Sequence, residues 1–176
     1  MDINVVSSIP FPIAEVFPAM RDQLQGLAEY MPNVDRIIEH ERDEVEPGVW
    51  KMLNQWFTAR TEIPAMARPF VDQNKMYWYD RATWNEAEML CRWQLEVGFM
   101  AERVQVGGTT SYHAKGDTTE MRIKGRLELD LKGLVPRLML KKATAGVESF
   151  IGRMIEPNFD KTADALTRYL ESKQGA

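Results

Sequence analysis

Residues 119–131, TEMRIKGRLELDL, alternate between apolar and polar side chains along most of their length. Alternation with a period of two predicts a strand with one dry and one wet face, as antiparallel sheets have. At roughly 3.3 Å per residue this strand would be about 40 Å long, so the sheet must twist and curl. The dry face must then be covered by another element. That face consists of Met121, Ile123, Leu127, Leu129 and Leu131.

The covering element is predicted directly downstream. After Gly133 and Pro136 the apolar residues recur at helical spacing, which predicts a helix over about 135–172. Pro157 cannot donate a backbone hydrogen bond to the preceding turn, so a kink or break is expected there. This helix is the only predicted element long enough to cover the sheet.

The rest of the chain supplies more strands and a short helical region. A β-prone segment at 3–9 precedes a helical pattern over 13–30, which Pro18 and Gly26 are expected to split or bend. Glycines 107 and 108 indicate a bulge. The segment IPAMARPFV, 63–71, is predicted to be either an apolar lid or a loop packed on the sheet edge. Further strands are predicted at 34–45, 49–59, 76–84, 87–97 and 102–115.

This order of elements resembles the START/polyketide-cyclase superfamily, often abbreviated SRPBCC. The resemblance is carried by the switch from strand to helix, LELDLKGLVPRLML, and by the proline-containing last helix, MIEPNFDKTADALTRYL. It implies an α+β helix-grip fold, with a curved antiparallel sheet of about seven strands wrapped around a long C-terminal helix and two short helices after the first strand. It also implies that residues 1–176 form a single START-like domain with an apolar ligand between sheet and helix.

The predicted interior is rich in tryptophan and methionine and has a few polar groups. Pockets for small ligands have this makeup, apolar walls with a handful of orienting groups. The alternative is a solid core in which the tryptophans and methionines only fill space. The predicted ligand-binding residues are Asn54, Trp56, Trp78, Asp80, Met89, Trp93, Thr110, Tyr112, Phe150 and Met154.

Asp80 has two possible environments. A buried carboxylate without partners costs several kcal/mol or stays protonated, so an inward Asp80 should be hydrogen-bonded or lie at a wet cavity mouth. A local bulge could instead turn it to solvent. Both alternatives remain open from the sequence.

Known catalytic and metal-binding patterns are absent from the sequence. The only histidines, His40 and His113, lie on predicted polar faces, and no His/Cys cluster suits zinc. The sequence has no G-x-S-x-G elbow, P-loop or G-x-G-x-x-G motif. Cys91, the only cysteine, is expected to be an inert buried thiol. We therefore predict no catalytic residue, no metal site and no cofactor.

Charge and hydropathy limit the partners. A net charge of −4 argues against nucleic-acid binding, which needs a basic surface. Apolar runs are too short to span a membrane, no secretory signal is apparent, and a single cysteine suits the reducing cytoplasm. The basic amphipathic segment LVPRLMLKK, 134–142, is predicted either to touch an anionic membrane transiently or to be an ordinary solvated helix start.

The leading hypothesis is therefore non-catalytic binding or transport of an apolar small molecule or lipid in an internal cavity. The resemblance also permits a polyketide cyclase/aromatase- or hydratase-like enzyme that uses Asp80, Tyr112 or Asn54 in the same cavity. A protein-interaction module is the third alternative, and it would show a large exposed apolar patch instead of a cavity.

Overall fold

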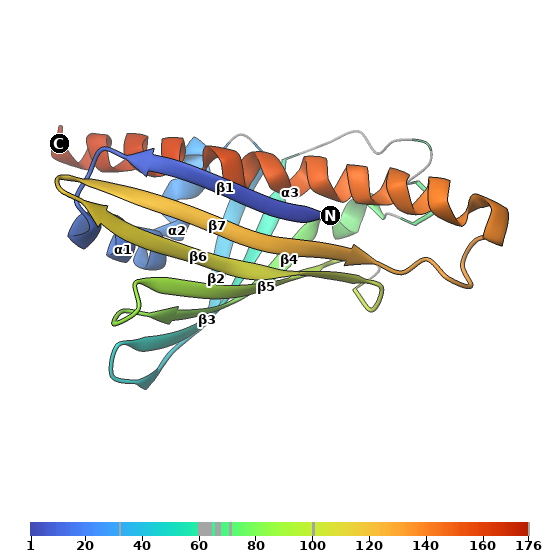
Figure 1. Ribbon diagram of the computed structural model, residues 1–176, viewed down its shortest axis with the longest axis horizontal. Helices are drawn as coiled ribbons and strands as arrows, with labels where there is room; N and C mark the ends of the chain where they lie inside the picture. The colour runs from blue at the N-terminus through green and yellow to red at the C-terminus, as the bar shows by residue number, and fades with distance from the viewer. Residues whose placement is uncertain (32, 60–64, 66–67, 71, 100, 176) are drawn as a thin grey trace.

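The computed structural model describes residues 1–31, 33–59, 65, 68–70, 72–99 and 101–175 (Figure 1). The element order is the predicted one: a strand, two short helices, six strands and a long helix. The elements are β1 (Asp2–Ile9), α1 (Ile13–Asp22), α2 (Leu24–Leu27), η1 (Ala28–Tyr30), β2 (Val34–Glu46), β3 (Val49–Thr58), η2 (Gln73–Lys75), β4 (Tyr77–Asn85), β5 (Leu90–Val97), β6 (Val104–Lys115), β7 (Thr118–Leu129) and α3 (Arg137–Gln174).

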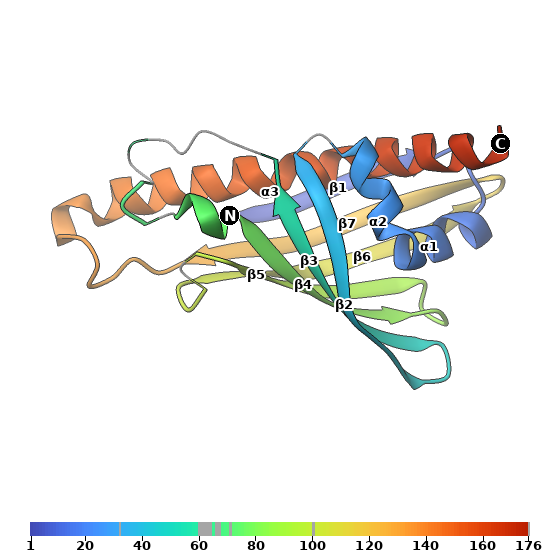
Figure 2. The same ribbon diagram turned by 180° about the vertical axis from the view of Figure 1, so that it is seen from behind.

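The strands form one antiparallel sheet with the order β1-β7-β6-β5-β4-β3-β2. β1 pairs with β7 instead of β2, so the first and last strands lie side by side. Figures 1 and 2 show α3 running along the sheet, with β1, β7 and β6 beside it and β2 and β3 crossing steeply beneath it. The predicted α+β fold, a curved antiparallel sheet wrapped around the C-terminal helix, is confirmed.

β7 has the predicted alternation. Met121, Ile123 and Leu127 are buried, whereas Arg122 and Lys124 are exposed. The strand ends at Leu129, two residues earlier than predicted, because the chain turns there. The side chain of Asp130 accepts a hydrogen bond from the backbone N–H of Lys132 at 2.9 Å. Gly133 follows with φ +81°, a conformation that glycine adopts without steric cost.

The predicted break in the last helix is wrong. α3 continues from Arg137 to Gln174 with Pro157 inside it. Phe150 and Ile151 are buried before the proline, and Ala163 and Leu166 are buried after it. We infer that packing on both sides outweighs the one backbone hydrogen bond that proline cannot donate.

The predicted split of the first helical region is confirmed, but its position differs. α1 ends at Asp22 and α2 begins at Leu24, so the break lies at Gln23 and not at Pro18 or Gly26. A Cβ on Gly26 would approach Tyr169 Cε2 to 2.9 Å. The Tyr169 hydroxyl donates a hydrogen bond to Gln23 Oε1 at 3.0 Å. The glycine therefore lets α2 approach α3 closely, which the sequence pattern alone did not reveal.

The predicted bulge at Gly107 and Gly108 is also wrong. Both residues stay in register, Gly107 opposite Gln94 and Arg126, and Gly108 opposite Trp93 and Gly125. These glycines make room for a side chain, as described below.

Two further predictions concern the segment 63–71 and the absence of a membrane-spanning segment. Within the predicted lid or loop at 63–71, only residues 65 and 68–70 are among those that the structure describes. None of the described helices combines the length and hydrophobicity that a membrane span requires.

Candidate functional site

A cavity of about 80 Å³ lies between the sheet and the helices. A single water molecule needs roughly 10–15 Å³, so the space exceeds an ordinary packing defect. α1, α2, α3 and the five strands β3 to β7 all contribute to its wall. The lining residues are Met20, Leu24, Trp56, Trp78, Asp80, Trp84, Cys91, Trp93, Leu95, Thr110, Tyr112, Ile123, Asn158, Phe159 and Thr162.

Aromatic pairs form much of this wall. Trp56 and Trp78 are cross-strand neighbours whose rings stack at 5.6 Å with an interplanar angle of 18°. Trp84 and Tyr112 stack at 6.2 Å. Aromatic pairs at such separations stabilise a fold beyond the area they bury. The wall is therefore built largely from rings that hold one another in place.

Trp93 connects the sheet to α3. Its ring lies 5.1 Å from that of Phe159, between centroids, and its indole N–H donates a hydrogen bond to Thr110 Oγ1 at 3.1 Å. A Cβ on Gly108 or Gly125 would approach the Trp93 ring to 2.6 Å. The absence of side chains at these two glycines therefore creates the hollow that Trp93 occupies.

Asp80 lines the cavity from the middle of β4. The residue as a whole retains some accessible surface, as expected for a cavity wall, but its Oδ1 atom is buried and accepts no hydrogen bond from any described residue. Burial raises the pKa of Asp80 to about 7, and the nearby indole N–H of Trp56 opposes that rise. The Trp56 N–H does not reach full hydrogen-bond geometry with any described acceptor. Near neutral pH, this carboxyl group can therefore exchange a proton.

Several other buried polar atoms around the cavity also lack a hydrogen-bond partner among the described residues. They are Trp56 Nε1, Trp84 Nε1, Tyr112 Oη, and both amide atoms of Asn54. Asn54 is fully buried and lies directly opposite Asp80 on the neighbouring strand. Buried polar groups in native proteins are nearly always satisfied, so each of these groups can accept or donate to a ligand or to water.

Solved structures with similar folds come from several kinds of protein. A protein of Thermus thermophilus matches with a TM-score of 0.69 and 14% identity, over 98% of this chain and 99% of that chain. An aromatase/cyclase from a Streptomyces species matches with a TM-score of 0.61 and 14% identity, over 99% and 94% of the two chains. Norcoclaurine synthase from Thalictrum flavum, solved with dopamine and hydroxybenzaldehyde, matches at 0.64 and 10% identity, over 98% and 87%.

The chain has the helix-grip fold. The predicted resemblance to the START/polyketide-cyclase superfamily is thereby confirmed at the level of fold. No protein-family model matches the sequence, and a search of curated proteins finds no matching relative.

The helix grip brings together six of the ten predicted site residues. Those around the cavity are Trp56, Trp78, Asp80, Trp93, Thr110 and Tyr112. Asn54 is buried outside the lining. Met89 lies in the turn before β5 with φ +47°, so it is not part of the strand as predicted. Phe150 packs against Phe99 at 6.1 Å between ring centroids, and the side chain of Met154 lies outside the described part of the structure.

The helices contribute lining residues that the predicted site did not include. Met20 and Leu24 come from α1 and α2, and Asn158, Phe159 and Thr162 come from α3. Asn158 and Thr162 are one helical turn apart, so they lie on the same face of α3. The α3 part of the lining therefore lies C-terminal to Phe150 and Met154, the two α3 residues that were predicted for the site.

The lining offers little to a metal ion or a nucleophilic mechanism. Among the described residues, no three His, Cys, Asp or Glu side chains are grouped as metal ligands. Cys91 is buried, and burial together with the Asp80 charge raises its pKa well above the usual range. A thiol in this state is a poor nucleophile.

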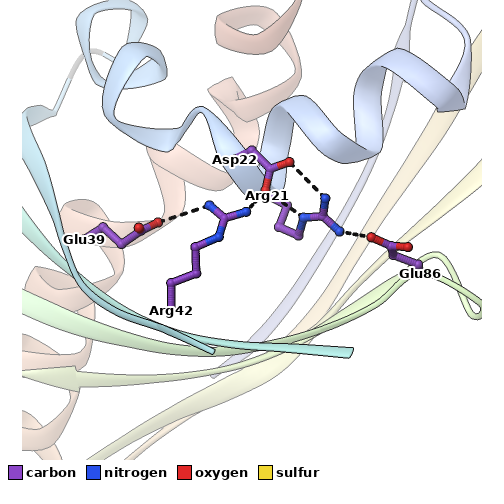
Figure 3. Close-up of polar contacts among 5 residues, drawn as sticks. All are labelled: Arg21, Asp22, Glu39, Arg42 and Glu86. Carbon is purple, nitrogen blue, oxygen red and sulfur yellow. Dashed lines mark hydrogen bonds and ion pairs between the residues drawn. The ribbon is translucent and has the colours of Figure 1, made fainter. Parts of the chain in front are cut away.

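A cluster of charged side chains joins the C-terminal end of α1 to the sheet, and we call this cluster the clasp (Figure 3). The Arg21 guanidinium forms hydrogen bonds to both carboxylate oxygens of Asp22, at 2.7 and 2.9 Å, and also donates to Glu86 in the β4–β5 turn. From β2, Arg42 donates to Asp22 and lies 3.5 Å from Glu39. The clasp consists of Arg21, Asp22, Glu39, Arg42 and Glu86.

Trp50 on β3 packs against the two arginines of the clasp. The guanidinium carbons of Arg21 and Arg42 lie 5.2 and 5.0 Å from the centre of its ring. Burial alone would raise the pKa of Asp22, but the hydrogen bonds and charges of the two arginines outweigh burial and lower it. Met20 and Leu24 of the cavity wall flank Arg21 and Asp22 in sequence, so the clasp anchors the α1–α2 corner of the grip.

The segment 134–142 is exposed at the start of α3. The exposed fraction of Leu138 is 100%, that of Met139 is 57% and that of Leu134 is 49%. Arg137, Lys141 and Lys142 are exposed among them. Apolar side chains of this size are not normally left uncovered at three neighbouring places without a partner.

Proposed function

We propose that residues 1–176 act as a single domain that binds a small, largely aromatic or apolar molecule in the cavity. The observation that carries this proposal is the cavity itself, which is lined by four tryptophans and bordered by polar atoms that have no hydrogen-bond partner among the described residues. Its volume of about 80 Å³ is below the roughly 300–1,000 Å³ of pockets for drug-sized ligands. This favours a small molecule over a lipid.

Cavity binding can be tested with two matched threonine variants of α3. The hydroxyls of Thr162 and Thr167 each donate to the backbone carbonyl four residues earlier, but only Thr162 lines the cavity. We expect Thr162→Leu to fill the cavity and remove a co-purified ligand detected by native mass spectrometry. Thr167→Leu should retain the ligand. Equal retention by both variants would place the ligand elsewhere, and the absence of any ligand under gentle ionisation would argue against the proposal.

A second candidate function is an enzyme that uses the same cavity. The pKa of Asp80, about 7, favours it, because a general acid or base works best when its pKa lies near the operating pH. Tyr112, which lines the cavity, would then position or polarise the substrate. Two of the proteins with similar folds are an aromatase/cyclase and a synthase. Loss of turnover with retained binding in Asp80→Asn would support catalysis, and unchanged turnover would remove Asp80 from it.

For segment 134–142 we propose transient contact with an anionic membrane. Three exposed apolar side chains and three exposed cations support this, since such surfaces bind membranes by combining apolar insertion with electrostatic attraction.

We further propose that nucleic acid is not a partner, because the net charge is −4. The cytoplasm is the proposed compartment, since the only cysteine cannot form an internal disulfide.

A further inference from the structure

The cavity has an uncompensated negative group. Among the described residues of the lining, Asp80 is the only carboxylate, and none is a lysine, arginine or histidine. Within the described part of the chain, Asp80 forms no ion pair and its Oδ1 atom accepts no hydrogen bond. A buried charge is ordinarily neutralised by a partner or by protonation. The described part of the chain supplies no countercharge for Asp80.

The surrounding wall is electrostatically favourable to a cation. Trp56, Trp78, Trp84 and Trp93, with Tyr112 and Phe159, make up much of the lining. The faces of aromatic rings carry partial negative charge, and tryptophan attracts cations most strongly, more so when water is excluded. The carboxylate and the indoles around this small cavity therefore both favour a positively charged ligand.

We infer that this cavity selects a small organic ammonium ion, which lies against the Asp80 carboxylate between the aromatic side chains. The inference rests on the proposed function, because it specifies the chemistry of the molecule bound in that cavity. A neutral molecule could accept hydrogen bonds from Trp56 and Tyr112, but it would leave Asp80 without a countercharge. An ammonium ion satisfies Asp80 by charge and by its N–H donors.

The other titratable groups near Asp80 do not change this balance. Cys91 on β5 and Tyr112 on β6 both line the cavity, and burial raises the pKa of each well above its usual range. Both groups therefore stay neutral near pH 7. Since the pKa of Asp80 is about 7, the carboxyl group is mostly protonated at pH 5.5 and mostly ionised at pH 8. Cation binding should strengthen over this interval.

The inference can be tested with two probes of nearly equal size and shape, tert-butylammonium chloride and tert-butanol. Each is titrated into the full-length protein while the indole N–H resonances are followed by NMR. At pH 8 we expect the ammonium ion to bind at least tenfold more tightly than the alcohol. The preference should shrink at pH 5.5.

Asp80→Asn separates charge from shape. It should bind tert-butanol as the wild type does and lose the preference for the ammonium ion. Asp117→Asn, which removes one charge at the exposed β6–β7 turn, should keep that preference. If both probes bind the wild-type protein equally, the cation inference fails and small-molecule binding stands. If neither probe shifts the resonances of the cavity tryptophans at high millimolar concentration, both proposals fail.

Discussion

At the residue scale, Asp80 couples the stability of the protein to pH. Burial raises its pKa from an ordinary value near 3.8 to about 7. Between these values the folded protein holds a proton that the unfolded chain has released, so stability falls as pH rises. The stabilising contribution of the proton on Asp80 is complete below pH 4 and is lost above pH 7. One pKa unit corresponds to roughly 1.4 kcal/mol, so the loss reaches roughly 4 kcal/mol.

Asp80→Asn should remove this dependence, because the amide has the shape of the acid but cannot ionise. At pH 8 we expect the variant to unfold roughly 8–16 °C above the wild type, since roughly 1 kcal/mol shifts Tm by about 2–4 °C in a chain of this size. Near pH 4 the two proteins should unfold together. Thermal unfolding followed by circular dichroism at both pH values measures the difference. A difference independent of pH would show that Asp80 ionises as freely in the folded protein as in the unfolded chain.

Gly108 should tolerate no side chain. A Cβ there would lie 2.2 Å from the Lys124 carbonyl oxygen and 2.6 Å from the Trp93 ring. Gly108→Ala must therefore displace β7 backbone or Trp93, and we expect it to cost about 1–3 kcal/mol, the range for overpacked cores. Gly107→Ala is the matched control, since its Cβ meets only the Trp93 carbonyl oxygen at 3.4 Å. Urea denaturation of both variants measures the costs, and equal costs would contradict the proposed role of Gly108.

At the element scale, periodicity predicted which strand faces point inward. Trp56 on β3 and Trp78 on β4, both predicted to face the cavity, are buried. A strand has only two faces, so one correctly assigned residue fixes the rest. The same logic placed Asp80 beside the tryptophans. The alternative, in which a local bulge turns Asp80 to solvent, is wrong because β4 contains no register shift against β3.

The features that the sequence did not predict depend on contacts between distant elements. The continuity of α3 through Pro157 reflects packing on either side of it, and the Gly107–Gly108 pair reflects the size of Trp93 on the next strand. The position of the cavity along α3 depends on where the helix begins after the turn at Gly133. Periodicity gives the face of a helix but not its displacement along the sheet, so Asn158 and Thr162 could not be chosen over Phe150.

The start of α3 yields a prediction about membranes. Leu138 is fully exposed, so Leu138→Ser should change the free energy of unfolding by less than about 0.5 kcal/mol, as surface substitutions usually do. If segment 134–142 contacts anionic lipid, the same variant should sediment less with vesicles containing phosphatidylserine than the wild type does. Val6→Ser, at another exposed apolar residue on β1, is the control. Equal sedimentation of all three proteins would favour the ordinary solvated helix start.

At the scale of the whole molecule, the sheet, α3 and the α1–α2 corner enclose the cavity from different directions. α3 packs most closely on β1 and β7, whereas the large rings of β3 to β5 occupy the wider side of the grip. The corner, which contributes Met20 and Leu24, is a short pair of helices. Its clasp attaches it to β2 and to the β4–β5 turn, far from it in sequence (Figure 3). The position of this wall therefore depends on charge.

Breaking the clasp should admit solvent to the cavity. Asp22→Asn weakens both arginine contacts without changing the size of the side chain, so the α1–α2 corner should open more often. We expect acrylamide to quench the cavity tryptophans at least twofold faster than in the parent protein. Both proteins should carry Trp50→Phe, because the Trp50 ring contacts both arginines of the clasp and would respond directly. Asp43→Asn, which removes an exposed charge on the β2–β3 hairpin, should leave quenching unchanged.

The two arginines lower the pKa of Asp22, so protonation of Asp22 at low pH should reproduce the effect of the substitution. Quenching that is the same in all variants would mean that the corner is held by its apolar contacts alone.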